Sequence, residues 1–95
     1  MNYEWFEVPV HVAIHTERRD TFKTRTNNLS TGGMNVEMDA SWIIRKKTLV
    51  TIEFIDEYFS EKIPALVLET TATSVSLMFT KKTADLHSFL RNLAS

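Results

Sequence analysis

The feature that most constrains the fold of this chain is an alternation of apolar and polar residues that recurs in separate short segments. A period of two is typical of a strand with one buried face, because successive side chains point to opposite faces. The pattern occurs at residues 8–15, 22–27, 34–39, 50–55, 65–69 and 74–79. Polar or turn-forming stretches separate these segments. The sequence therefore predicts six short strands.

The periodicity changes after the sixth predicted strand. Apolar residues now follow the i, i+3, i+4, i+7 spacing that lines one face of a helix. They are Leu86, Phe89, Leu90 and Leu93. Thr83 is a suitable N-cap, and Asp85 in the first turn is favourable to the helix dipole. We expect a short C-terminal helix.

Six strands and one helix, without repeats, linkers or low-complexity sequence, indicate a single domain over residues 1–95. The predicted fold class is all-β with one helix: a six-stranded antiparallel β-barrel capped by a C-terminal α-helix. In the connection at 40–47, we expect three apolar residues to close one end of the barrel. They are Trp42, Ile43 and Ile44.

The composition of the chain excludes some kinds of site and disfavours others. The 95-residue chain has no cysteine and a net charge of −1. Disulfides and thiolate metal sites are therefore excluded, and non-specific nucleic-acid binding is not favoured. No secretory signal is visible, and no apolar run approaches the roughly 18 residues that span a bilayer. We expect a cytoplasmic protein without a membrane span.

No residue pattern indicates catalysis or a metal site. His11 and His15 would share one face of a strand, about 13 Å apart. That separation is too large for one zinc ion with ligands at roughly 2.0–2.1 Å. Ser30 has no base evident in the sequence, and no two carboxylates can be assigned to one cleft. We therefore expect neither an enzyme nor a metal protein, and no cofactor.

Both glycines of the chain are adjacent, in the stretch NNLSTGGM at 27–34. Glycine tolerates a positive φ without a Cβ penalty, which suits a sharp turn before the third predicted strand. Asn28 and Ser30 can hydrogen-bond nearby backbone groups and fix the turn. From spacing alone, a structural turn is the favoured interpretation.

A chain with this turn after the second of six strands, and with a helix at its end, resembles the PilZ domain. The PilZ domain is a bacterial module associated with the second messenger cyclic di-GMP. The D/N-x-S-x-x-G motif of the family matches Asn28, Ser30 and Gly33, and the apolar strand MNVEM follows it. VPVHVAI is similar to the first strand of the family, SVSLMF to its last strand and LHSFLRNL to its terminal helix. The resemblance covers nearly the whole chain. It implies a PilZ-like split barrel with cyclic di-GMP as the candidate ligand.

The sequence departs from the family at a second motif. Members that bind cyclic di-GMP carry R-x-x-x-R just before the first strand, and these arginines contact phosphate and guanine. Tyr3 and Glu7 occupy the two positions here, and the first ten residues contain no Lys or Arg. Charge-assisted hydrogen bonds contribute roughly 1.5–3 kcal/mol each. Losing two would weaken binding by about a hundred-fold to ten-thousand-fold.

The resemblance thus implies a divergent, stand-alone regulatory module with weak or no nucleotide binding, acting through protein contacts. Family members regulate motility, type IV pili and surface behaviour, so these pathways are implied. Aromatic residues outside the predicted strands are candidates for the protein contacts; the alternative is that they pack under the barrel ends. They are Trp5, Phe6, Tyr58 and Phe59.

Other cations could replace the missing arginines only if they lie near the turn. Arg18 and Arg19 lie at the other end of the second predicted strand, roughly 26 Å away for some eight residues. Arg25, three residues before Asn28, is a candidate anion contact, although an exposed strand arginine is the simpler interpretation.

Two alternatives remain open. The first is a genuine cyclic di-GMP receptor that uses Asn28, Ser30 and Gly33 with arginines that the sequence does not place. The second is a small β-barrel nucleic-acid binder that uses cations and a surface aromatic. Its cations would be Arg18, Arg19 and the cluster at 45–47, although basic clusters such as this one and that at 81–82 are more simply solvated.

Overall fold

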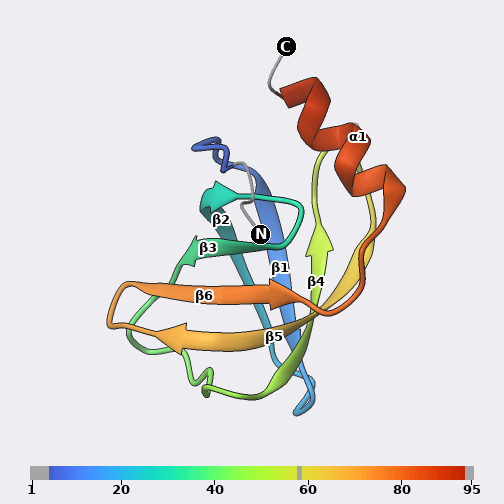
Figure 1. Cartoon of the computed structure of the whole chain (residues 1–95). Coiled ribbons are helices and arrows are strands. Elements are labelled where there is room, and N and C mark those ends of the chain that lie inside the picture. Colours follow the sequence, from blue (N-terminus) through green and yellow to red (C-terminus); the bar gives the residue numbers. More distant parts are fainter. Residues whose placement is uncertain (1–4, 58, 94–95) are drawn as a thin grey trace.

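In the computed structural model, which describes residues 5–57 and 59–93, the six predicted strands close into an antiparallel barrel (Figure 1). The elements are β1 (His11–Thr16), β2 (Thr21–Leu29), β3 (Gly33–Glu37), β4 (Leu49–Phe54), β5 (Lys62–Thr70), β6 (Ser74–Phe79) and α1 (Ala84–Leu93). The strand order around the barrel is β1-β2-β3-β6-β5-β4, and β4 pairs with β1 to complete it. The predicted fold class is confirmed.

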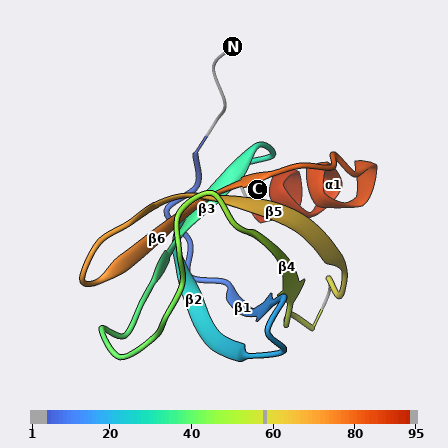
Figure 2. The same ribbon diagram turned by 90° about the horizontal axis from the view of Figure 1, so that it is seen from below.

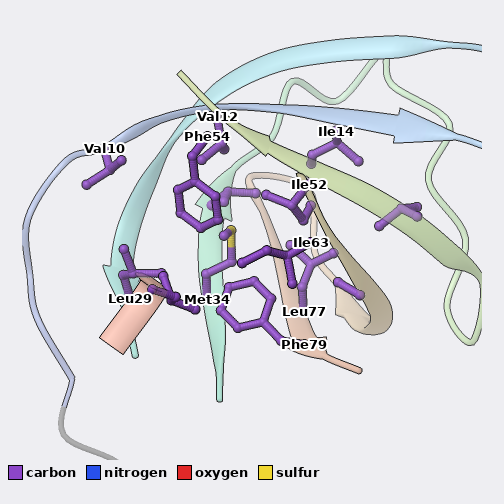
Figure 3. Packing of buried hydrophobic residues seen from close by; sticks show 14 of the residues in the cluster. Val10, Val12, Ile14, Leu29, Met34, Ile52, Phe54, Ile63, Leu77 and Phe79 are labelled. Carbon is purple, nitrogen blue, oxygen red and sulfur yellow. The ribbon is translucent and has the colours of Figure 1, made fainter. Parts of the chain in front are cut away.

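Apolar side chains on the inner face of the strands fill the barrel (Figure 3). Val12 and Ile14 of β1 are fully buried, as is Ile52 of β4. Figure 3 shows these side chains directed into the same interior as Phe54 of β4 and Met34 of β3. In β4 and β6 every second residue is buried because side chains alternate between the two faces of a strand, whereas in β1 Ala13 is buried as well.

Helix α1 packs on this core through the face predicted from its periodicity. Leu86, Phe89 and Leu90 are buried, and the Phe89 ring stacks on Phe59 with centroids 4.7 Å apart. The Thr83 hydroxyl oxygen accepts a hydrogen bond from the Leu86 N–H at 3.1 Å, so Thr83 is the N-cap as predicted. Across the described ranges 5–57 and 59–93, no helix has both the length and the apolar character to cross a membrane.

Several strands begin or end at other residues than predicted, because contacts with residues distant in the sequence set these bounds. β1 begins at His11 rather than at residue 8, because the Val10 N–H donates to the Thr26 hydroxyl at 2.9 Å instead of to a backbone carbonyl. β2 continues two residues further than predicted, to Leu29, and β5 begins three residues earlier. Pairing with neighbouring strands thus extends the sheet into residues with low strand propensity.

The connection between β3 and β4 only partly closes the barrel. Ile44 is buried in the core, and the half-buried Trp42 stacks on Phe22 of β2 with ring centroids 5.0 Å apart. Ile43, however, is 70% exposed. The prediction that all three apolar residues close the barrel end is therefore wrong for Ile43, because its side chain is exposed between the half-buried Trp42 and the buried Ile44.

Candidate functional site

The candidate site is the turn between β2 and β3, which contains both glycines. Ser30 is fully buried, and its hydroxyl oxygen accepts hydrogen bonds from the N–H groups of Gly32 and Gly33, both at 3.1 Å. The Ser30 N–H donates to the Gly33 carbonyl at 2.8 Å, and the Ser30 hydroxyl reaches the same oxygen at 3.2 Å. The turn therefore satisfies these polar groups by itself.

Gly33 is needed because β6 passes very close to it. Neither glycine has a positive φ, so the conformational reason predicted from the sequence is wrong. A Cβ atom on Gly33 would lie 2.2 Å from the carbonyl oxygen of Leu77. Gly33 pairs with Met78, and the Phe79 N–H donates to the Gly32 carbonyl at 2.9 Å. The glycine thus allows two backbones to approach.

Asn28 belongs to β2 rather than to the turn. It pairs with Asn35 of β3, after a β-bulge between Thr26 and Asn28. The neighbouring Asn27 donates a side-chain hydrogen bond to Asn35 at 2.8 Å. The half-buried Asn28 side chain has no such partner among the described residues. The motif therefore joins a self-contained turn to an amide that can contact something else.

The segment before β1 lies against this turn. Phe6 and Leu29 exchange two backbone hydrogen bonds, of 2.8 and 3.0 Å. The buried Thr26 hydroxyl donates to the Val8 carbonyl at 2.7 Å and holds the segment against β2. Glu7 follows Phe6 and is exposed. Position 7 therefore lies near the end of β2, where the family pattern has an arginine and this chain has a carboxylate.

The predicted cations are distributed differently around the site. Arg25 binds Glu37 through two contacts, Nε to Oε2 at 3.1 Å and Nη2 to Oε1 at 3.2 Å. Its hydrogen bond to Glu37, together with the attraction of that charge, raises the pKa of Arg25. Arg18 and Arg19 lie in the β1–β2 connection, at the opposite end of β2 from the glycine turn, as expected.

Sequence reasoning did not place Lys81 near the site. The Phe79 N–H donates to the Gly32 carbonyl, and the exposed Lys81 follows two residues later in the chain. Its backbone is therefore tied to the neighbourhood of the glycine turn through β6. Only the pairing of β6 with β3 reveals this, because 48 positions separate Lys81 from Gly33 in the sequence.

The aromatic candidates for protein contacts do not form one surface. Phe59 is 7% exposed and packs against Phe54, with ring centroids 4.9 Å apart, so its expected exposure is wrong. Phe6 is half-buried against the core, whereas Trp5 is 52% exposed. Tyr58 lies outside the described residues, as does Tyr3.

An exposed apolar row on the outer face of the sheet was not predicted. Leu49 of β4 pairs with Leu66 of β5, and Leu66 pairs with Met78 of β6. Leu49 is 52% exposed and Met78 is 42% exposed. The signal was the presence of apolar residues at outward positions of three strands, but only the register shows that they are neighbours.

Comparison with known proteins identifies the family. The family model of the PilZ domain matches residues 1–94. The chain belongs to the PilZ domain family. PilZ domains are regulatory binding modules linked to cyclic di-GMP signalling rather than enzymes. A search of curated proteins finds no match.

Solved structures share the PilZ fold at low sequence identity. The PilZ domain of CeSA from a cellulose-synthesizing bacterium is 15% identical, with a TM-score of 0.81, covering 97% of this chain and 99% of that one. The PilZ domain of Escherichia coli YcgR with c-di-GMP is 14% identical, with a TM-score of 0.78 and coverage of 98% and 87%. Bacillus subtilis MotI/DgrA, an inhibitor of motility, is 16% identical, with a TM-score of 0.75; this chain aligns in full but spans 52% of MotI.

Proposed function

We propose that this PilZ domain is a divergent regulatory module in cyclic di-GMP-linked bacterial signalling, acting through protein contacts with weak or no nucleotide binding. The observation that carries the proposal is Glu7, an exposed carboxylate on the segment that pairs with Leu29 beside the glycine turn. Control of motility or type IV pili is the corresponding pathway, and a cytoplasmic location stays a prediction.

The physical reason is electrostatic. Cyclic di-GMP carries two phosphates, and a ligand of that charge needs cations or backbone donors at its phosphates. At the glycine turn, the N–H groups of Gly32 and Gly33 are already directed at the Ser30 hydroxyl. Arg25 is engaged by Glu37, and Glu7 adds a negative charge. These features support a turn that has kept its shape without the charges that hold a dianion.

A titration of the nucleotide-free protein with cyclic di-GMP, followed by backbone amide NMR, tests the proposal. We expect no saturable shifts of Ser30, Gly32 and Gly33 up to high-micromolar nucleotide. Glu7→Gln serves as the matched variant, because it removes the negative charge and keeps the shape of the side chain. Micromolar binding by the unmodified protein, with shifts in the turn, would overturn the proposal.

A genuine cyclic di-GMP receptor is the second candidate, and two observations favour it. The Asn28 amide has no side-chain partner among the described residues, and the exposed Lys81 follows two residues after Phe79, whose N–H donates to the Gly32 carbonyl. If this candidate is correct, Lys81→Ala should weaken nucleotide binding by at least about tenfold, the loss of one charge-assisted contact. Arg18→Ala, at the far end of β2, is the control and should leave binding unchanged.

A further inference from the structure

The beginning of β2, at residues 21–23, has a strand neighbour on one side only. Residues 21–25 pair with β1, whereas ladder pairing with β3 begins at Thr26, and Thr24 and Arg25 contact Glu37 at the end of β3 through their side chains. The β-bulge between Thr26 and Asn28 separates the two halves of β2, and a bulge bends its strand and increases the twist. After β3 the Met38 N–H donates to the Thr73 carbonyl at 2.8 Å, so this residue stays bonded to the connection before β6. Figure 2 shows β2 and the segment after β3 diverging.

The parity of the β1–β2 ladder shows which backbone groups face the open side. The Thr26 N–H donates to the Val10 carbonyl at 2.9 Å. Hydrogen-bonded and non-hydrogen-bonded pairs alternate along an antiparallel ladder. The backbone of Thr24 therefore faces β1, and the N–H and carbonyl of Lys23 face away from it. Within the described part of the chain, no strand is registered beside Lys23 on that side.

A cleft of about 620 Å³ lies along this edge. One wall is the strand at Lys23, Thr24 and Arg25, and the facing wall includes Met38 and Trp42. The two walls differ in character, since the exposed lysine and arginine lie on the outer face and the half-buried Met38 and Trp42 are apolar. The cleft thus combines an open strand edge with an apolar inner side.

The charged side chains that line the cleft balance formally, with Lys23 and Arg25 against Glu37 and Asp39. Arg25 is paired with Glu37, and the Asp39 carboxylate accepts hydrogen bonds from the Ser41 N–H at 2.9 Å and hydroxyl at 2.8 Å. These two bonds hold the pKa of Asp39 below its usual range, the backbone bond being the larger cause. Lys23 makes no side-chain hydrogen bond or ion pair with any residue of the described ranges, and its charge attracts Glu53 only as a minor cause of the lowered pKa of that carboxyl. On the outer face of the strand edge, an acidic side chain of the partner is therefore favoured beside Lys23.

We propose that the open edge of β2 binds an extended segment of a partner protein by strand addition. Backbone groups of the added strand would pair with those of Lys23, since strand edges bind extended peptides through main-chain hydrogen bonds. Side chains of the added strand alternate, so acidic ones meet Lys23 on the outer face and apolar ones meet Met38 and Trp42. The inference names a surface for the protein contacts proposed above and rests on them.

The probe is a capped seven-residue peptide that alternates glutamate and valine, titrated into the labelled protein. We expect saturable amide shifts at Lys23 and Arg25, and hydrogen exchange of the Lys23 amide slowed by about tenfold or more. Two further peptides carry N-methyl groups on alternate residues. Strand addition needs only every second peptide N–H, so one methylated peptide should bind and the other should lose binding by at least about tenfold.

A pair of variants separates the backbone contribution from the charge. Lys23→Pro removes the N–H on the open edge, a position where proline is compatible with a strand, and should weaken peptide binding by about tenfold or more. Lys23→Ala keeps that N–H and should weaken binding by only a few-fold. Thermal melting shows whether Lys23→Pro folds, and the methylated peptides provide the same test on the unmodified protein.

Three results would overturn strand addition: no binding at millimolar peptide, equal binding of both methylated peptides, or shifts confined to the row of Leu49, Leu66 and Met78. The nucleotide titration is followed by the amide shifts of Ser30 and Gly33, which lie apart from the peptide-dependent shifts at Lys23 and Arg25. Tight nucleotide binding would therefore refute the proposed function without removing strand addition, and the absence of peptide binding would refute strand addition alone.

Discussion

The two segments that meet at the candidate site, the glycine turn at 30–33 and the N-terminal segment at 5–10, are held in different ways. The turn satisfies its polar groups through the Ser30 hydroxyl, and Gly33 is fixed by the backbone of Leu77. The N-terminal segment depends on Thr26 and presents Glu7 to solvent. Folding therefore accounts for the motif in the turn, whereas nothing in the N-terminal segment supplies a charge for an anionic ligand. A motif of this kind can remain because the barrel needs its shape.

The largest expected effect is that of Gly33→Ala. The added Cβ would lie 2.2 Å from the Leu77 carbonyl oxygen, so β3 or β6 must shift. We expect unfolding in urea to show a loss of about 3 kcal/mol, the upper end for overpacking. Gly32→Ala is the matched control, since Gly32 is half-exposed, and should cost less than about 1 kcal/mol. Equal costs at the two positions would contradict the close-approach explanation.

Ser30→Ala should cause the second-largest loss of stability. The substitution leaves the buried Gly33 N–H and the partly buried Gly32 N–H without their acceptor. We expect a loss of about 2 kcal/mol in the free energy of unfolding, measured without any nucleotide. Asn28→Ala removes the other polar residue of the motif and should cost about 0.5 kcal/mol or less. If Ser30→Ala proves neutral in the absence of ligand, the self-contained turn is the wrong description.

Thr26→Val tests how the N-terminal segment at 5–10 is held against β2. Valine keeps the shape of threonine but removes the hydroxyl that binds the Val8 carbonyl and the Val10 N–H. We expect a cost of about 1–2 kcal/mol, because two buried backbone groups lose their partner. Amide exchange of Leu29 should also quicken, since this N–H donates to Phe6. Unchanged exchange at Leu29 would show that Thr26 does not hold the segment.

The smallest effect is expected at an exposed contact further along β1. His15 bonds to Glu53 at 2.8 Å, and this hydrogen bond is the main cause that lowers the pKa of Glu53. A lowered pKa stabilises the folded state above the ordinary value of about 4.3, and the gain is lost as pH falls through the folded-state pKa. Glu53→Gln should therefore be slightly less stable than the unmodified protein at neutral pH, and the difference should vanish as the pH falls below the folded-state pKa of Glu53. A difference that persisted in acid would exclude this linkage.

Much of the fold could be predicted because alternation and helical spacing are local signals. All six strands and the Thr83 cap followed from such patterns. The reason for Gly33 could not, because it depends on Leu77 of a strand that is distant in the sequence. Phe59 was similarly misjudged, since its acidic neighbours suggested a solvated loop while its ring packs against the core.

The candidate site was predicted in composition but not in arrangement. The motif residues and the missing arginines could be read directly from the sequence. The β-bulge at Asn28, the approach of Lys81 to the turn and the open edge at Lys23 depend on strand register. Register is set by long-range pairing, so a single sequence gives no local signal for these features.

The most direct test of the central claim, that the turn kept its shape without the charges for a ligand, is a paired calorimetric titration with cyclic di-GMP. One sample is the unmodified protein, and the other carries Tyr3→Arg together with Glu7→Arg. We predict no measurable heat for the first and binding at least about a hundred-fold tighter for the second, from two restored charge-assisted contacts. Equal and tight binding by both proteins would contradict the claim.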